Sequence, residues 1–292
     1  MIAMRLVRPL IATAMVITAT GLPAVPAQAT RQASATPTLV DVRAAHQPGL
    51  DRLVFEFRGR LPATHDVRYV PRLFADGSGH RVHVVGGALL QVRFDGADGH
   101  DLRGDVTYGP QRRTYALPGV IQVVNTGDFE ATLTFGVGLA RRVPVKVYTL
   151  TRPSRVVIDL ATPYRTVPVR AYFRGADDRD TAVRRPVIAP ATAFGALQRL
   201  FAGPTQAERA RGLRFVASKS TGFSRLTVER GVARVHLTGP CGSGGAAYTI
   251  ADQIRPTLKQ FPSIKWVKIY DAAGHTQRPD GRGDSIPRCL EP

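Results

Sequence analysis

Long hydrophobic runs are absent from this 292-residue chain, apart from one near its N-terminus at residues 10–22. That run is too short for a convincing membrane-spanning helix, which needs about 20 apolar residues. No segment downstream has the required length, so no transmembrane segment is expected. Cysteine is also scarce, with two in the chain, and neither lies near Ala29, which excludes a lipid anchor at that point.

The N-terminal run has the flanks of a secretory signal peptide. Arg5 and Arg8 precede it, and Ala27-Gln28-Ala29 follows it as an A-x-A cleavage sequence. We therefore expect residues 1–29 to be a signal peptide cleaved near Ala29. Residues 30–38 are rich in Ala, Thr, Gln, Ser and Pro and predict a flexible leader. The mature protein is expected to be secreted, and extracellular or associated with the cell wall.

The charge is strongly one-sided, with 40 Lys and Arg against 22 Asp and Glu and a formal net charge of +18. The basic residues are nearly all arginine and are scattered, without a Lys/Arg block that has interleaved aromatic residues. No nucleic-acid partner is therefore expected. An anionic envelope polymer or membrane surface fits an exported cation better. The alternative is an arginine-rich composition that only solvates the surface.

Residues 39–162 alternate apolar and polar side chains in many short segments separated by glycine-rich turns. This pattern predicts an all-β, sandwich-like domain or a barrel. The expected core consists of the inward alternating side chains: Leu53, Phe55, Phe57, Leu133, Phe135, Val156 and Ile158.

Two prolines within residues 161–168 mark a domain boundary, after which helices appear. The order over residues 167–273 reads β-β-α-β-β-α-β, an open α+β sandwich, so the chain is α+β overall. Thr192 is the expected cap of the first helix, and Thr205 with Glu208 has capping-box spacing for a further short helix. Residues 274–292 form a turn-rich tail.

The best-defined α/β unit lies at residues 239–270. Ser243 follows a glycine-rich turn and is a suitable N-cap for the next helix. The apolar residues of that helix recur at helical spacing and predict one buried face: Ile250, Ile254, Leu258 and Phe261. Residues 264–269 alternate and predict a closing strand.

Cys241 and Cys289 make an even pair in an oxidising compartment. A disulfide between them would tie the tail back to the glycine-rich turn. The alternative is a reactive thiol at Cys241, which needs a nearby base, and none is adjacent in sequence.

The glycine-rich turn is also the candidate binding site. Gly242, Ser243, Gly244 and Gly245 would place free N–H groups at a helix start, where anions such as phosphate or carboxylate bind. The same residues match the nucleophile elbow G-x-S-x-G only loosely, and no orienting acid is visible. No catalytic residues are therefore assigned.

No metal or cofactor is expected. His80 and His83 would point to opposite faces of a strand, which is poor geometry for one ion. Asp95, Asp98 and Asp101 could hold calcium, but their spacing is not that of an EF-hand loop. A solvated turn is the favoured interpretation of these three carboxylates.

Residues from about 167 to 273 resemble a GerMN domain, the module named from sporulation and germination proteins. The matching segments are Val169 to Phe173, Ala196 to Leu200 with Gly203-Pro204-Thr205, Gly231 to Val235, and Gln253 to Leu258 with Gln260-Phe261-Pro262.

Upstream segments resemble the AMIN-like domain of secreted actinobacterial proteins. They are Gly127 to Glu130, Gly136-Val137-Gly138 and Pro153 to Asp159.

The resemblance implies a non-catalytic cell-envelope protein. The β domain would bind cell-wall polymer or another envelope component, and the GerMN-like domain a ligand or another envelope protein. The alternative is a secreted hydrolase or an accessory subunit that regulates one. A role in sporulation or spore germination would follow from the family name alone.

Overall fold

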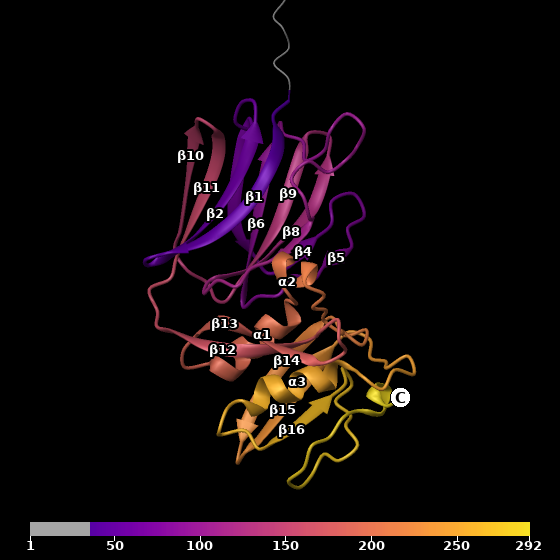
Figure 1. The fold of residues 1–292 in the computed structure, drawn as a ribbon. Coiled ribbons are helices and arrows are strands. Elements are labelled where there is room, and N and C mark those ends of the chain that lie inside the picture. Colours follow the sequence, from indigo (N-terminus) through magenta and orange to yellow (C-terminus); the bar gives the residue numbers. More distant parts are fainter. Residues whose placement is uncertain (1–35) are drawn as a thin grey trace, which may run out of the picture. The chain divides into compact units, whose positions relative to one another are not determined.

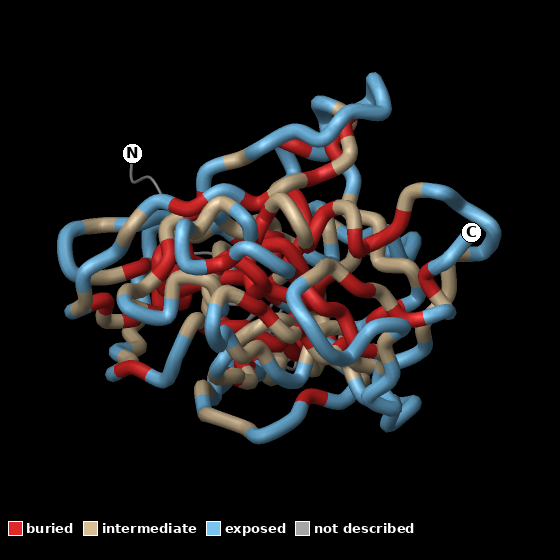
Figure 2. The backbone as a smooth tube through the Cα atoms, turned by 90° about the horizontal axis from the view of Figure 1, so that it is seen from below, coloured by how far each residue is buried: buried red, intermediate tan, exposed pale blue. Residues whose placement is uncertain are grey.

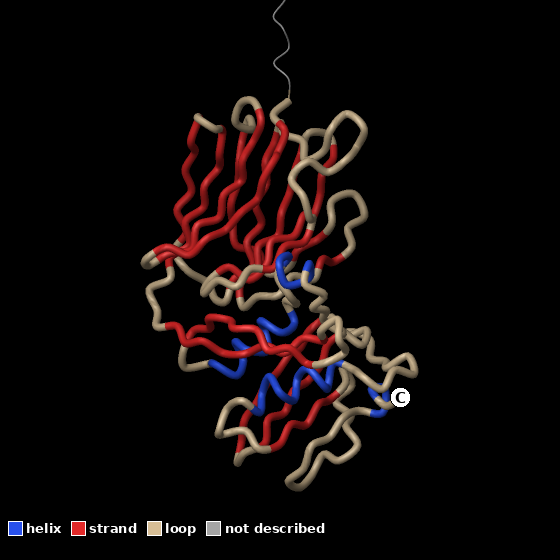
Figure 3. Tube along the Cα trace, in the orientation of Figure 1, coloured by secondary structure: helices blue, strands red, loops and turns tan. Residues whose placement is uncertain are grey.

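The computed structural model describes residues 36–292. The expected signal peptide and most of the leader lie outside these residues. Among the described helices, none is long and apolar enough to cross a membrane. Figures 1 and 3 show strands through most of the N-terminal half and helices confined to the C-terminal half.

The N-terminal half is a sandwich of two antiparallel sheets. One has the strand order β1-β2-β11-β10, and the other β3-β6-β9-β8-β7, with β4 and β5 as a separate pair. The strand bounds are β1 Thr38–Gln47, β2 Leu50–Arg58, β3 Thr64–Val70, β4 Leu73–Phe74, β5 Arg81–Val82, β6 Ala88–Asp95, β7 Arg112–Thr114, β8 Val120–Phe129, β9 Thr132–Leu139, β10 Val145–Thr151 and β11 Ser154–Ala161.

The two sheets share one hydrophobic core, to which each contributes the inward residues of its strands. Phe55 of β2 lies 5.0 Å from Phe94 of β6 and 5.1 Å from Phe135 of β9, measured between ring centroids. All seven core residues expected from the alternation are buried, which confirms that part of the sequence reading. Figure 2 shows the buried backbone enclosed by exposed loops.

The C-terminal half mixes strands and helices, as expected, and its strands form two sheets. These are β12-β13 and β14-β15-β16, with β15 and β16 parallel. The bounds are β12 Thr166–Arg174, β13 Asp180–Ile188, α1 Thr192–Phe201, α2 Gln206–Ala210, β14 Gly222–Glu229, β15 Val232–Thr238, α3 Ile250–Lys259, β16 Trp266–Tyr270 and the 3-10 turn η1 Arg288–Leu290. The overall fold class is therefore the predicted one.

Helices α1 and α3 pack on β12, and α3 also packs on β16, which joins the two small sheets through one core. Ile250, Ile254 and Leu258 of the expected buried face of α3 are fully buried, whereas Phe261 lies beyond the end of the helix and is half-buried. Helix α3 also serves as the crossover between the parallel strands β15 and β16, as parallel pairing requires.

The helix caps differ in part from the expectation. The capping box of α2 is confirmed, with Thr205 and Glu208 bonded reciprocally to each other's backbone N–H. Helix α1 has Ala191 as its N-cap without a side-chain bond, so Thr192 is the first helical residue. Helix α3 is capped by Thr249, so the assignment of Ser243 as its N-cap was wrong.

Candidate functional site

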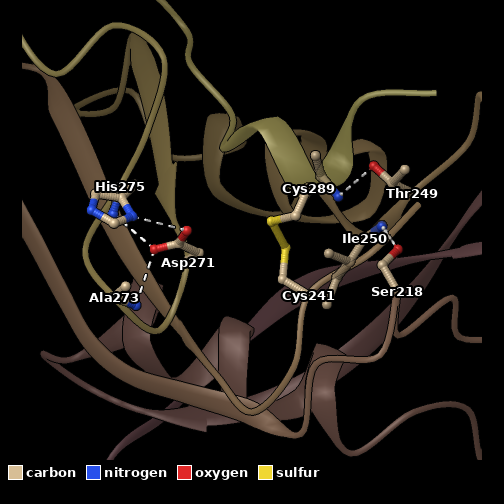
Figure 4. Close-up of a disulfide and its surroundings, with 9 residues drawn as sticks. Ser218, Cys241, Thr249, Ile250, Asp271, Ala273, His275 and Cys289 are labelled. Carbon is tan, nitrogen blue, oxygen red and sulfur yellow. Dashed lines mark hydrogen bonds and ion pairs between the residues drawn. A yellow bond between two sulfur atoms is a disulfide. The ribbon is translucent and has the colours of Figure 1, made fainter. Parts of the chain in front are cut away.

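The disulfide-pinned loop, residues 239–249, contains the residues that the sequence singled out. Cys241 and Cys289 are bonded, with their Cα atoms 5.6 Å apart, so the tail is tied to this loop as expected. Figure 4 shows the bridge beside the first turn of α3. There the backbone N–H of Ile250 donates to the Ser218 hydroxyl at 2.9 Å.

Gly242, Ser243, Gly244 and Gly245 lie in this loop and not at the start of the helix. The backbone N–H of Ser243 donates to the Cys289 carbonyl at 2.7 Å, and its hydroxyl accepts from Gly245 N–H at 3.2 Å. The helix begins later than expected because Thr249 and Asp252 form a capping box six residues after Ser243. Anion binding by the four loop residues remains a prediction.

The loop has the geometry of a structural element. The Cys241 sulfur is in a disulfide and offers no thiol. The bonds described for Ser243 involve neither a histidine nor a carboxylate, so nothing in them activates its hydroxyl as a nucleophile. Asp271 and His275, also in Figure 4, lie 3.5 Å apart on an exposed turn.

Asp95, which was weighed as a calcium ligand, and His100, which follows the same glycine-rich turn, have other partners. Asp95 accepts from Thr64 at 2.7 Å and from Arg93 at 2.8 Å, and these bonds lower its pKa. His100 lies 2.9 Å from Asp128, whose hydrogen bond and charge raise the histidine pKa. Within residues 36–292, no three His, Cys, Asp or Glu side chains are arranged to hold a metal ion.

A second candidate site lies along helix α1, and we call it the α1 groove. It consists of two cavities of about 340 and 490 Å³ that share His83, Val85, Phe201 and Thr221 in their walls. Volumes of this size are typical of ligand sites. No Asp or Glu lines either cavity.

Four arginines line the groove: Arg81, Arg112, Arg209 and Arg214. Arg112 is oriented by its Nη1, which donates to the His83 carbonyl at 3.0 Å and to Gln122 Oε1 at 3.3 Å. Burial and the charges of Arg81 and Arg112 lower the pKa of His83, which favours the neutral form of the ring. Arg209 Nη1 donates to the Pro204 carbonyl at 2.6 Å, and Arg214 is ion-paired with Asp178. The arrangement presents the guanidinium groups of Arg81, Arg112 and Arg209 to an incoming anion.

Phenylalanine rings form the apolar wall of the groove. Phe223 lies 5.1 Å from Phe194 and 5.3 Å from Phe201, between ring centroids, and Phe201 lies 5.6 Å from Phe215. Phe194 is 39% exposed, so part of its ring is accessible to a ligand. A cationic rim beside aromatic rings suits a ligand that has both charge and apolar surface.

Hydrogen bonds from β7 and β8 hold the end of α1 at the groove. Thr114 Oγ1 and Gln122 Nε2 both donate to the Ala202 carbonyl, at 2.6 and 2.9 Å. Gln122 Oε1 also accepts from Val85 N–H at 2.9 Å, and the side chain is almost fully buried. The sequence reading missed the groove, and the one signal for it was Gln122 in the otherwise apolar segment Val120 to Val124.

Family models match both halves of the chain. The AMIN-like domain matches residues 37–162, and the sporulation and spore germination domain, Germane, matches residues 170–277. Both families are binding-type modules without catalytic residues. The disulfide is consistent with folding in an oxidising compartment.

No curated protein matches this sequence. Among solved structures, the chain is similar to the tandem GerMN domains of the sporulation protein GerM from Bacillus subtilis, at 19% identity and a TM-score of 0.30. That similarity covers 44% of this chain and 46% of the other. On the two family matches, this chain carries an AMIN-like domain followed by a Germane domain of the sporulation and spore germination family.

Proposed function

We propose that this chain is an exported, non-catalytic cell-envelope protein that binds an anionic cell-wall polymer. The signal peptide at residues 1–29 would export it, with cleavage near Ala29. Residues 39–162 would act as the wall-binding module and residues 167–273 as a module for a ligand or another envelope protein. The AMIN-like and Germane families support this division of roles.

The α1 groove is the observation that carries the proposal. Arg81 and Arg112 in its wall belong to the wall-binding module, and residues 167–273 supply the aromatic rings beside them. Arg112 is held by the His83 carbonyl and by Gln122, and Arg209 by the Pro204 carbonyl. Of the four arginines, Arg214 is paired with Asp178, and no carboxylate lines the cavity walls of the groove. Its phenylalanine wall offers apolar surface to sugar rings. A glycopolymer with phosphate or carboxylate groups presents both complements at once.

Sedimentation of the mature chain, residues 30–292, with purified insoluble cell wall tests the proposal. The groove variant Arg81→Gln/Arg112→Gln is compared with the control Arg72→Gln/Arg184→Gln, which removes the same charge from exposed arginines outside the groove. Each arginine beside an anionic surface contributes about 1 kcal/mol. The groove variant should therefore bind roughly 30-fold more weakly, at about 1.4 kcal/mol per factor of ten.

The control variant should keep most of its binding, because the loss depends on position and not on net charge. An equal loss in both variants would show that only bulk charge matters. No sedimentation of the wild type would reject wall binding altogether. Release of soluble wall fragments by the wild type would instead favour the alternative of a hydrolase or its accessory subunit.

A further inference from the structure

A separate cavity of about 280 Å³ adjoins the α1 groove, and we call it the Arg141 pocket. Its walls come from Ala140 and Arg141 after β9, from residues 187–191 at the end of β13 and just beyond it, and from the first turns of α1. It shares Phe194 and Gln198 with the groove. Most of the other lining side chains are small or aliphatic.

Arg141 and its neighbour Arg142 have similar surroundings, but only Arg141 lines the pocket. Arg141 lies over the ring of Tyr164, 5.3 Å from its centroid, and Arg142 lies over the ring of Tyr69 at 4.3 Å. Both are exposed, and neither forms an ion pair with a described carboxylate. Only Arg141 lines the pocket, so the chain supplies its own control.

Arg199 forms another part of the wall and is 2% exposed. Its Nη2 donates to the Pro118 carbonyl at 2.7 Å, while its Nε and Nη1 have no hydrogen-bond partner among residues 36–292. Burial and the charge of Arg185 lower its pKa to about 9, so it is still cationic at neutral pH.

A buried cation with unused N–H groups costs free energy, and a nearby anion reduces that cost. The carboxylate of Asp51 is engaged elsewhere, since it accepts from Gly119 and Val120 N–H at 2.6 and 2.8 Å and lies 2.7 Å from the His46 ring nitrogen. No Asp or Glu lines the pocket. A ligand carboxylate at its mouth would meet the field of both arginines.

We propose that the Arg141 pocket binds a short aliphatic carboxylate, with the carboxylate on Arg141 and the alkyl part against Val187, Pro190 and Phe194. The volume lies just below the usual range of about 300–1,000 Å³ for small-molecule sites, which limits the ligand to a few carbons. Such a group occurs as a free acid or as a carboxylate-bearing substituent of a polymer. The pocket is independent of the arginines that the wall-binding test removes.

Calorimetric titration of the mature chain with sodium hexanoate tests this site. Hexanoate should bind the wild type and Arg142→Gln alike, and Arg141→Gln at least tenfold more weakly, because a charged hydrogen bond is lost. Acetate lacks the alkyl part and hexan-1-ol lacks the charge, so each should bind at least tenfold more weakly than hexanoate. Ala140→Leu should abolish binding by filling the cavity while leaving both arginines in place.

Equal affinities for hexanoate and hexan-1-ol, or equal losses in Arg141→Gln and Arg142→Gln, would overturn the proposal. So would unchanged binding in Ala140→Leu with an unchanged urea midpoint. Hexanoate is then added to the sedimentation assay: displacement of the wild type from cell wall identifies a polymer substituent as the source, and no displacement identifies a free acid. The groove variant Arg81→Gln/Arg112→Gln should retain hexanoate binding even if wall binding fails.

Discussion

The substitution Glu208→Gln should destabilise the C-terminal half strongly, because Glu208 forms a buried ion pair with Arg185. The two residues are 7% and 1% exposed. Arg185 Nη1 donates to Glu208 Oε1 at 2.8 Å, Nη2 donates to Oε2, and Nε has no described partner. Glutamine keeps the shape, and its amide oxygen can still accept from Thr205 N–H. Its NH2 replaces the other acceptor of Arg185, so the change removes the charge and one acceptor.

Breaking a buried pair by removing one partner costs about 3–5 kcal/mol, since the other charge stays buried and uncompensated. That is a large share of a typical folding free energy of about 5–15 kcal/mol. Replacing both partners, as in Arg185→Met/Glu208→Gln, should restore most of the lost folding stability, because no buried charge remains. Urea unfolding, followed by fluorescence of the single tryptophan, Trp266 in β16, measures both effects.

The pH dependence of the same variants gives a second measurement. Burial alone would raise the pKa of Glu208, but its bonds with Arg185 and Thr205 lower it. A carboxylate with a lowered pKa contributes stability above its unfolded pKa of about 4.3 and loses it as pH falls through the folded value. The difference in unfolding free energy between wild type and Glu208→Gln should therefore narrow below about pH 4. A loss under 1 kcal/mol at pH 7, or a double variant as unstable as the single one, would refute the reasoning.

Three further substitutions test other parts of the fold. Replacing Cys241 and Cys289 with serine should cost about 4 kcal/mol by chain entropy for a 48-residue separation, and reduced wild type should match the variant in urea unfolding. Because Asp128 raises the pKa of His100, wild type should exceed His100→Gln in stability more at pH 5 than at pH 8; an NMR titration giving a pKa below 6.5 would contradict this. Phe135→Ala should cost about 3–5 kcal/mol in unfolding free energy, and a loss below 1 kcal/mol would contradict its place in the sandwich core.

The sandwich could be predicted because its determinants are local. In β2, the period of two places Leu53, Phe55 and Phe57 on one face, and burial of that face needs no knowledge of its partner. The same holds for the apolar face of α3. These residues are buried as the pattern requires.

The helix start was misplaced because two hydroxyl residues compete for it. Ser243 follows glycines and precedes helix-forming alanines, but the third residue after it is Ala246. Thr249 has Asp252 at that position, whose carboxylate accepts from the Thr249 N–H at 2.8 Å. The reciprocal bonds of the capping box therefore favour Thr249 over Ser243 as the N-cap.

The α1 groove could not be predicted, because it joins segments that are far apart in the sequence, such as residues 81–86 and 220–224. In α1, Phe194, Leu197, Leu200 and Phe201 recur at helical spacing, which alone would leave Gln198 and Arg199 facing solvent. Both are nevertheless buried. The bond from Arg199 to the Pro118 carbonyl shows that the nominally polar side of α1 is covered by the AMIN-like half.

The Ala202 carbonyl accepts two hydrogen bonds from the other module, and these bonds limit how far the two modules can be separated. The last carbonyl groups of a helix need hydrogen-bond donors from outside the helix. At the end of α1 these donors are Thr114 and Gln122 of the other module. A C-terminal fragment that begins after residue 162 would lose both donors and uncover Arg199. A Germane half transplanted next to an unrelated neighbour would therefore need replacement donors for the Ala202 carbonyl.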